Sequence, residues 1–322
     1  MREKFEALFK NELSFDEARD FLVNLYEKGE SAEDIAAAAE VMRSHSIKLP
    51  IPQQLQEKLI DVVGTGGDKS GSFNVSSTVA LLLPSLGSYV AKHGNRSITS
   101  KSGSADMLEA LGINLNLTPQ QQVELLQRTG FTFIFAINHH PAMKHIMPVR
   151  KSLSHRTIFN ILGPLTNPAG AQKYLLGVFD KSFIPKIAEA LVKMGTKKAL
   201  VVSSEDGMDE ISICDETHCA LVENGKVEEF TIAPEEFGMQ RAERKEILGG
   251  EARENAAITR AILEGKERGA KRDMVLLNAG AALFVDGKAQ SIQEGIKMAA
   301  EAIDSGEAAK KLEEIIKVSQ SL

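Results

Sequence analysis

The sequence predicts an α/β protein with a small N-terminal all-helical domain and a larger domain with a mostly parallel central sheet flanked by helices. Two observations support this prediction. Residues 1–58 carry helical patterns that end at Pro50 and Pro52, and from residue 59 short β-rich runs alternate with longer helical patterns. We therefore expect a helical domain over residues 1–58, joined in space by a helical segment near 140–170, and an α/β domain over residues 59–322.

The helical domain begins with two helices. Ser14-Phe-Asp-Glu17 has the form of a capping box, and Ala18 and Leu22 follow at helical spacing. A second helix begins near Ser31 and carries small side chains over residues 36–39. These would let another helix approach closely, either from a second subunit or from the same chain.

The larger domain should contain five parallel strands and one hairpin. We expect the parallel strands at residues 59–63, 88–92, 131–136, 174–179 and 199–203, with helices between them. The stretch 210–232 contains Asn224-Gly225, a dipeptide typical of tight turns between antiparallel strands. It therefore predicts a hairpin.

Composition argues against several classes of protein. A net charge of -6 in 322 residues argues against a surface covered with nucleic acid. The charged first residues lack a signal-peptide core, and the apolar run from Val79 is broken by Pro84, so neither secretion nor a membrane span is expected. Cys214 and Cys219 are too few for a disulfide framework, which favours a reducing cytoplasm, and together with His218 they fall short of a zinc site.

A glycine-rich loop follows the first strand. Gly64, Gly66, Gly67 and Gly71 allow backbone amides to approach a ligand, and a helix starting near Ser76 would add its positive end. A tight turn without a ligand would explain one or two glycines, but not the polar residues that accompany them, Asp68, Ser72, Asn74 and Ser76. The loop therefore predicts a phosphate-type ligand.

Neither of the common nucleotide-binding motifs fits this loop. A dinucleotide fingerprint would need glycine at Lys69, and a Walker loop would need Gly-Lys-Ser/Thr where Gly71-Ser-Phe stands.

A second glycine turn, Lys92-His-Gly-Asn-Arg96, follows the second strand, and Lys101 comes shortly after. Because parallel strands present their carboxyl ends on one side of a sheet, both loops should face the same crevice. Amides and hydroxyls from one loop and cations from the other suit a ligand with more than one phosphate.

Two further segments carry charge. The basic stretch 139–150 precedes the turn-rich stretch 156–168, where an arginine could clamp a carboxylate. Residues 203–210 place four carboxylates around Gly207 after a strand. Such a segment is either a solvated turn or a holder of Mg²⁺, which is often bound by one or two carboxylates plus substrate phosphates.

Taken in order, these motifs resemble those of the anthranilate phosphoribosyltransferase family, whose members have the nucleoside phosphorylase-like phosphoribosyltransferase fold. The resemblance covers about residues 60 to 210. It is carried by Gly64-Thr-Gly-Gly-Asp68, Asn74-Val-Ser-Ser77, Lys92-His-Gly-Asn-Arg96, Ser102-Gly-Ser-Ala-Asp106, Phe159-Asn-Ile-Leu-Gly-Pro-Leu-Thr-Asn-Pro168 and Asp209-Glu210.

The resemblance implies transfer of a phosphoribosyl group from 5-phosphoribosyl 1-diphosphate to the amine of anthranilate in tryptophan biosynthesis, with Mg²⁺ as cofactor. It implies a cytoplasmic homodimer joined through the helical domain, which favours the subunit interpretation of the small-residue helix, and neither nucleic acid nor a membrane as partner. The implied ligands of the phosphoribosyl donor are Gly64, Gly67, Asp68, Ser72, Asn74, Val75, Ser76, Ser77, Lys92, His93, Gly94, Asn95, Arg96, Ser100 and Ser104.

The family pattern also implies the remaining roles. Anthranilate would be bound by Gly64, Asn95 and Arg150, with Gly64 and Ser104 at the boundary between the two substrates, and Mg²⁺ by Ser76, Asp209 and Glu210. The expected catalytic residues are Lys92, His93 and Arg150. His93 would either accept the excess proton late in the reaction or serve a purely structural role.

The chain departs from the family pattern at Lys69, where glycine is common, at Ser77, where threonine is usual, and at Ser154-His155 near the anthranilate entrance. Two other functions compete with the transferase. A pyrimidine nucleoside phosphorylase shares the fold, but the paired acids at 209 and 210 favour diphosphate chemistry. A nucleic-acid-binding relative would use the cations of residues 92–101 and 144–156.

Overall fold

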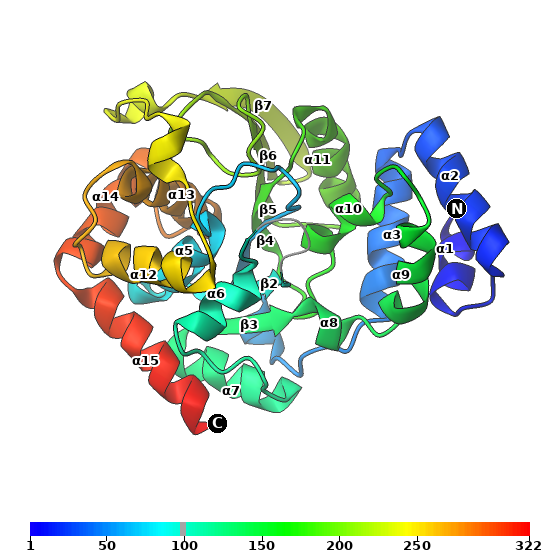
Figure 1. Ribbon diagram of the computed structural model, residues 1–322, viewed down its shortest axis with the longest axis horizontal. Coiled ribbons are helices and arrows are strands. Elements are labelled where there is room, and N and C mark those ends of the chain that lie inside the picture. The colour runs from blue at the N-terminus through cyan, green and yellow to red at the C-terminus, as the bar shows by residue number, and fades with distance from the viewer. Residues whose placement is uncertain (97–100) are drawn as a thin grey trace.

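A seven-stranded sheet forms the centre of the computed structural model, which describes residues 1–96 and 101–322. The strands lie in the order β3-β2-β1-β4-β5-β6-β7 (Figure 1). β1 to β5 are parallel, and β6 and β7 add an antiparallel edge. Their bounds are β1 Leu59–Gly64, β2 Tyr89–Gly94, β3 Phe131–Phe135, β4 Lys173–Gly177, β5 Lys198–Ser204, β6 Thr217–Glu223 and β7 Lys226–Ile232.

All five expected parallel strands are present, and the predicted fold class is confirmed. The hairpin turn lies at Asn224 and Gly225, whose φ angles of 52° and 71° suit the turn that joins twisted antiparallel strands. The prediction was wrong for residues 210–216, which form no strand because they belong to a loop stabilised by its own polar contacts, such as that of Ser212 N with Thr217 Oγ1.

Helices cover both faces of the sheet. Ile60 and Val62 of β1 point into one core, and Leu59 and Val63 point into the other, as the two-residue period of a strand requires. The first core includes residues of α5 Val75–Leu82, α6 Ser104–Ala110, α12 Ala252–Leu263, α13 Ala270–Asp286, α14 Ile292–Asp304 and α15 Glu307–Ser321. The second core includes α11 Ile184–Lys193, and α7 Pro119–Thr129 packs beside β3.

The N-terminal helices are α1 Arg2–Phe9, α2 Phe15–Lys28, α3 Ala32–Ser44 and α4 Gln53–Gln56. The predicted capping box is confirmed, since Ser14 N donates to Glu17 Oε2 at 2.8 Å and Glu17 N donates to Ser14 Oγ at 3.3 Å. Of the small residues 36–39 of α3, Ala36, Ala38 and Ala39 are buried, and α3 packs on α11. Their close contacts therefore include a helix of the same chain.

Three later helices follow β3: α8 Ala136–His139, α9 Met143–Lys151 and α10 Phe159–Leu162. α8 packs on β3, and His139 at its end contacts Ile47 after α3. α9 packs against α1 and α2, and α10 packs against α3 (Figure 1). We propose that these helices and residues 1–58 form one domain. Short 3-10 turns complete the chain at Leu83–Leu86, Gly163–Leu165, Lys181–Phe183, Pro234–Phe237 and Arg244–Ile247. None of the described helices has both the length and the apolar run needed to cross a bilayer.

Candidate active site

Loops from three distant parts of the sequence meet at the carboxyl ends of the parallel strands. The Gly66 amide donates to Asp209 Oδ2 at 2.7 Å, and the Ser76 amide donates to Glu210 Oε1 at 3.2 Å. Lys92 Nζ lies 3.3 Å from Ser76 Oγ. The glycine loop after β1, the lysine of β2 and the acidic pair after β5 therefore meet at one place, where the sequence predicted a crevice.

Two glycines make room for the acidic pair. A Cβ atom on Gly64 would overlap the Asp209 carboxylate, and one on Gly177 would overlap the Asp209 backbone carbonyl. Gly177 ends β4, so the Asp209 peptide lies directly against the end of the neighbouring strand. Gly177 was not among the predicted site residues, although a glycine inside the expected strand 174–179 was a visible signal of a close backbone approach.

This meeting point contains more acidic than basic side chains, and burial disfavours their charged forms. Burial and the nearby Asp68 raise the pKa of Asp209 to about 7. Burial and Asp209 raise the pKa of Glu210 well above its usual range, and Lys92 only partly opposes this. Lys92 is itself buried, which lowers the pKa of its ammonium.

The oxygen atoms of Asp209 and Glu210 suit a divalent cation. Hard cations prefer oxygen ligands, and a bound cation would stabilise the charged form of these clustered carboxylates. The described residues contain no group of three or more His, Cys, Asp or Glu side chains arranged to hold a metal ion. Any metal would therefore need further oxygen ligands, and Mg²⁺ commonly takes such ligands from substrate phosphates and water.

A buried carboxylate, that of Asp61, binds the backbone at the start of the second loop. Asp61 in β1 accepts the His93 amide at 3.2 Å and Asn167 Nδ2 at 2.8 Å, and it is fully shielded from solvent. Asn167 also donates to the Ala91 carbonyl at 2.8 Å. Burial raises the pKa of Asp61 to about 7, although Lys92 opposes the shift. A single aspartate inside an apolar strand is the sequence signal that could have predicted this role.

The hydrogen bonds of His93 fix its tautomer. Nδ1 lies 3.0 Å from the Gly163 carbonyl, which can only accept, so Nδ1 carries the hydrogen. Nε2 is then the acceptor, and it lies 3.3 Å from His140 Nε2, which must donate. Burial and the neighbouring His140 lower the pKa of His93 to about 3. The lone pair of His93 therefore faces another imidazole, and this favours a structural role over that of a base.

Arg150 lies on α9 with its guanidinium carbon 5.3 Å from the centre of the Phe159 ring. Its guanidinium contacts Met147 Sδ at 3.5 Å, and the described residues offer it no carboxylate partner. Burial lowers the pKa of Arg150. Because a partly buried cation without a counter-ion is costly, a bound carboxylate would stabilise this arrangement.

The predicted polar residues of the glycine loop differ in their surroundings. Asn74 donates to the Ser102 carbonyl at 3.2 Å and accepts from Asn255 at 2.8 Å, and Ser72 Oγ accepts from Ser70 Oγ at 3.0 Å. Ser77 is buried, and its Oγ has no hydrogen-bond partner among the described residues. The side chain of Val75 is also buried, so these two residues can offer a ligand only their backbone.

The second loop is held by the start of α6. Ser104 Oγ donates to the Asn95 carbonyl at 3.1 Å, and a Cβ atom on Gly94 would overlap that hydroxyl. Arg96 donates to Asp106 at 2.8 Å and to Glu109 at 2.6 Å, so its guanidinium is already paired. Ser100 lies outside the described residues.

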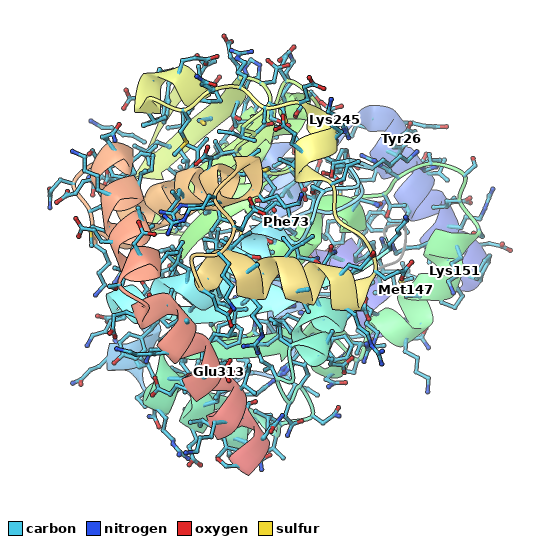
Figure 2. The ribbon with its side chains drawn as sticks, turned by 60° about the vertical axis from the view of Figure 1, so that its left-hand side comes forward. Tyr26, Phe73, Met147, Lys151, Lys245 and Glu313 are labelled. Atoms are coloured by element: carbon cyan, nitrogen blue, oxygen red, sulfur yellow. The ribbon has the colours of Figure 1, made fainter. Side chains whose placement is uncertain are left out.

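Arg156 binds the backbone of the glycine loop, a contact that was not predicted from the sequence. Its guanidinium donates to the Gly67 carbonyl at 2.7 Å and stacks 3.6 Å from the centre of the Phe179 ring. His155, one of the departures from the family pattern, stacks on Tyr26 with ring centres 3.9 Å apart. Tyr26 lies on the helical side of the molecule, with Met147 and Lys151 (Figure 2).

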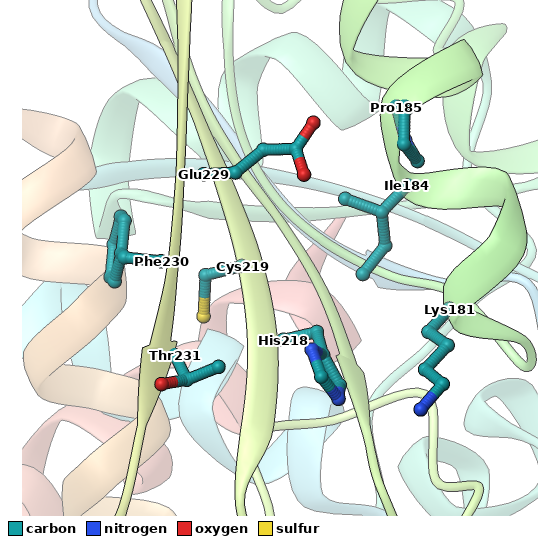
Figure 3. Close-up of a pocket in the computed structure, with 8 residues that line it drawn as sticks. All are labelled: Lys181, Ile184, Pro185, His218, Cys219, Glu229, Phe230 and Thr231. Carbon is teal, nitrogen blue, oxygen red and sulfur yellow. The ribbon is translucent and has the colours of Figure 1, made fainter.

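Two surface hollows lie outside the carboxylate cluster. One of about 370 Å³ lies between α11 and the β6–β7 hairpin (Figure 3). Lys181 and His218, which line it, both contact Glu205, so the Lys181 charge is locally balanced. The second, of about 350 Å³, is lined by Tyr26, Arg156 and Phe179 beside the glycine loop.

Similarity to known proteins shows the family to which the chain belongs. Residues 56–309 match the glycosyl transferase family, a/b domain, so the chain has the fold of that family. An anthranilate phosphoribosyltransferase of Methanobrevibacter smithii is 46% identical over 98% of this chain and 93% of its own length. One from Thioalkalivibrio sulfidiphilus is 48% identical over 94% of this chain and 88% of its own. The chain belongs to the anthranilate phosphoribosyltransferase family.

Solved structures of that family share the whole fold. The enzyme of Thermus thermophilus has a TM-score of 0.93 at 43% identity, covering 99% of this chain and 94% of its own. The Saccharomyces cerevisiae enzyme in complex with PRPP and Mg has a TM-score of 0.87 at 30% identity, covering 99% and 91%.

Proposed function

We propose that the protein transfers the phosphoribosyl group of 5-phospho-α-D-ribose 1-diphosphate to the amine of anthranilate, giving N-(5-phosphoribosyl)anthranilate and diphosphate. The observation that carries this proposal is the meeting of the glycine loop, Lys92 and Asp209-Glu210 in one crevice. The yeast relative, solved in complex with PRPP and Mg, supports the choice of donor and cofactor.

The donor diphosphate is expected to lie against the glycine loop and the first amides of α5. Asp209 and Glu210, with the Ser76 hydroxyl, would hold Mg²⁺. When bound, Mg²⁺ supplies positive charge that stabilises the departing diphosphate. Lys92 adds a buried positive charge next to the Ser76 hydroxyl. The loop amides would donate to diphosphate oxygens, whose negative charge grows as the bond to the sugar breaks.

Anthranilate is expected to lie toward the helical domain. Arg150 would pair with its carboxylate, while Asn95 and Gly64 would border the ring beside the sugar. The neutral aromatic amine needs no deprotonation before attack, so positioning matters more than a strong base. We assign His93 a positioning role, since its acceptor nitrogen already faces His140.

The direct test is the loss of anthranilate fluorescence after addition of phosphoribosyl diphosphate and Mg²⁺ to the purified protein. Omitting the donor or the metal should abolish the change. Phosphorolysis of uridine or thymidine without Mg²⁺ would instead favour a nucleoside phosphorylase, and salt-sensitive DNA binding without transfer would favour the nucleic-acid alternative.

Arg150→Ala is expected to raise the KM for anthranilate roughly 10- to 100-fold, because a charge-assisted contact with a carboxylate contributes roughly 1.5–3 kcal/mol. The KM for the phosphoribosyl donor should change little. Steady-state kinetics with each substrate varied in turn measures both. Lys151→Ala removes an exposed cation from the same helix and should leave both values unchanged. A variant with normal anthranilate kinetics and weakened donor binding would contradict the assignment.

Mg²⁺ binding to the protein alone should strengthen with pH. The metal-free pKa of Asp209 is raised to about 7, so below pH 7 a proton must leave before the carboxylate can bind the ion. Because the pKa of Glu210 is also raised, its proton must leave too, so the apparent Kd should fall at least about tenfold per pH unit below 7. Calorimetry in two buffers of different ionisation enthalpy measures the released proton. The same affinity at pH 6 and pH 8 would refute this coupling.

We further propose a cytoplasmic homodimer joined through the helical domain. Most of the large apolar side chains that are exposed in the described ranges lie on that side or in α8, namely Met1, Phe15, Tyr26, Ile47 and Ile137. Burial of such side chains between two copies would be favourable. Sedimentation equilibrium would measure the state of association.

A further inference from the structure

Asn278 of α13 holds the backbone of the residue that follows the acidic pair. Its Oδ1 accepts the Ile211 amide at 3.0 Å, and its Nδ2 donates to the Ile211 carbonyl at 2.8 Å and to the Met274 carbonyl at 2.9 Å. Asn278 is fully buried. One carboxamide thus pairs with both polar groups of a single residue, as a neighbouring strand would.

The acidic pair lies between two fixed points. On one side, Met208 is buried, its amide donates to Ser204 Oγ at 3.1 Å, and its carbonyl accepts the Ser204 amide at 3.0 Å. On the other side, Ile211 is buried and its amide and carbonyl both bind Asn278. Only Asp209 and Glu210 separate these anchors.

The two anchors differ in origin. The contact at Met208 is local, because Ser204 ends the preceding strand β5. The contact at Ile211 comes from 67 positions away, on a helix whose residues are mostly buried. A segment held at only one end would let the two side chains move away from the Gly66 and Ser76 amides that donate to them.

We propose that Asn278 is a positioning residue that holds Asp209 and Glu210 at the separation needed for Mg²⁺. The inference rests on the proposed function, in which these two carboxylates bind the metal. It adds a residue outside the segment that carried the family resemblance. Asn278 touches neither substrate nor metal and acts only through the Ile211 backbone.

The test compares the wild type with Asn278→Ala and Asn278→Leu. Leucine keeps a side chain of similar size in the apolar surroundings, so it guards against loss of fold in the alanine variant. Calorimetric titration of Mg²⁺ in the presence of inorganic diphosphate should show roughly 10- to 100-fold weaker metal binding, the range for partners that orient metal ligands. The Mg²⁺ concentration for half-maximal turnover should rise in parallel, while the KM for anthranilate stays constant.

Ser88→Ala is the matched control. Ser88 donates to Asp286 at 2.6 Å in a buried contact at the far end of the same helix. This variant should lose some thermal stability and keep wild-type Mg²⁺ affinity. Unchanged Mg²⁺ affinity in both Asn278 variants would overturn the inference, as would an equal loss in Ser88→Ala. A wild-type protein that fails to bind Mg²⁺ with diphosphate would overturn the proposed function itself, and the inference with it.

Discussion

Asp209→Asn combined with Glu210→Gln is expected to lower Mg²⁺-dependent turnover by about a thousandfold while the fold survives. Amides are poorer ligands for a hard cation than carboxylates. The raised pKa of both acids shows that the metal-free fold disfavours their charge, so the double variant should melt at the same temperature or higher. Initial rates over a Mg²⁺ series and thermal unfolding measure the two effects.

Glu205→Gln is the control for this experiment. Glu205 lies on the same loop but is exposed and pairs with Lys181 and His218. Its replacement should leave turnover intact. Undiminished activity in the double variant would remove the metal assignment, and a variant that has lost its fold would show that the pair is needed for structure.

Gly177→Ala is expected to give the second large effect, on stability and activity together. The added methyl group would overlap the Asp209 carbonyl, and a backbone atom cannot move aside as the end of a side chain can. Overpacking typically costs roughly 1–3 kcal/mol, and an overlap with a backbone atom belongs at the upper end of that range. Moving the Asp209 peptide also displaces both carboxylates, so the surviving fold should require more Mg²⁺. Denaturant unfolding and Mg²⁺ titration measure the two losses.

Gly269→Ala provides the comparison for that substitution. A Cβ atom there meets only the end of the Glu267 side chain, at 3.1 Å. This variant should therefore match the wild type in both measurements. Wild-type stability in Gly177→Ala would mean that the acidic loop can shift away from β4 at little cost.

The sequence was sufficient to predict the sheet and the meeting of the main segments. Each expected parallel strand had a local signal, a short β-rich run followed by a turn or a helical pattern. The rule that parallel strands end on one side then placed Gly67 and Lys92 in the same crevice. The acidic pair followed by the same rule, since it lies in the loop after β5.

The remaining features depend on contacts between residues far apart, which carry no local signal. Asp61 stands out in an apolar strand, but its partner Asn167 is 106 positions away. The need for glycine at 177 appears only when the Asp209 carbonyl is in place. Among the described residues Arg150 has no counter-ion. This depends on which side chains the fold brings near it, and no local sequence pattern predicts that.

The crevice joins Gly66 to Asp209, which are 143 positions apart in the chain. A growing polypeptide therefore has no complete site until β5 and the loop after it have been made and have paired with the strands already present. A substrate that bridges these loops binds only the finished sheet. By mass action it then opposes the separation of all the strands it spans, so occupancy in the cell would lengthen the lifetime of the folded enzyme.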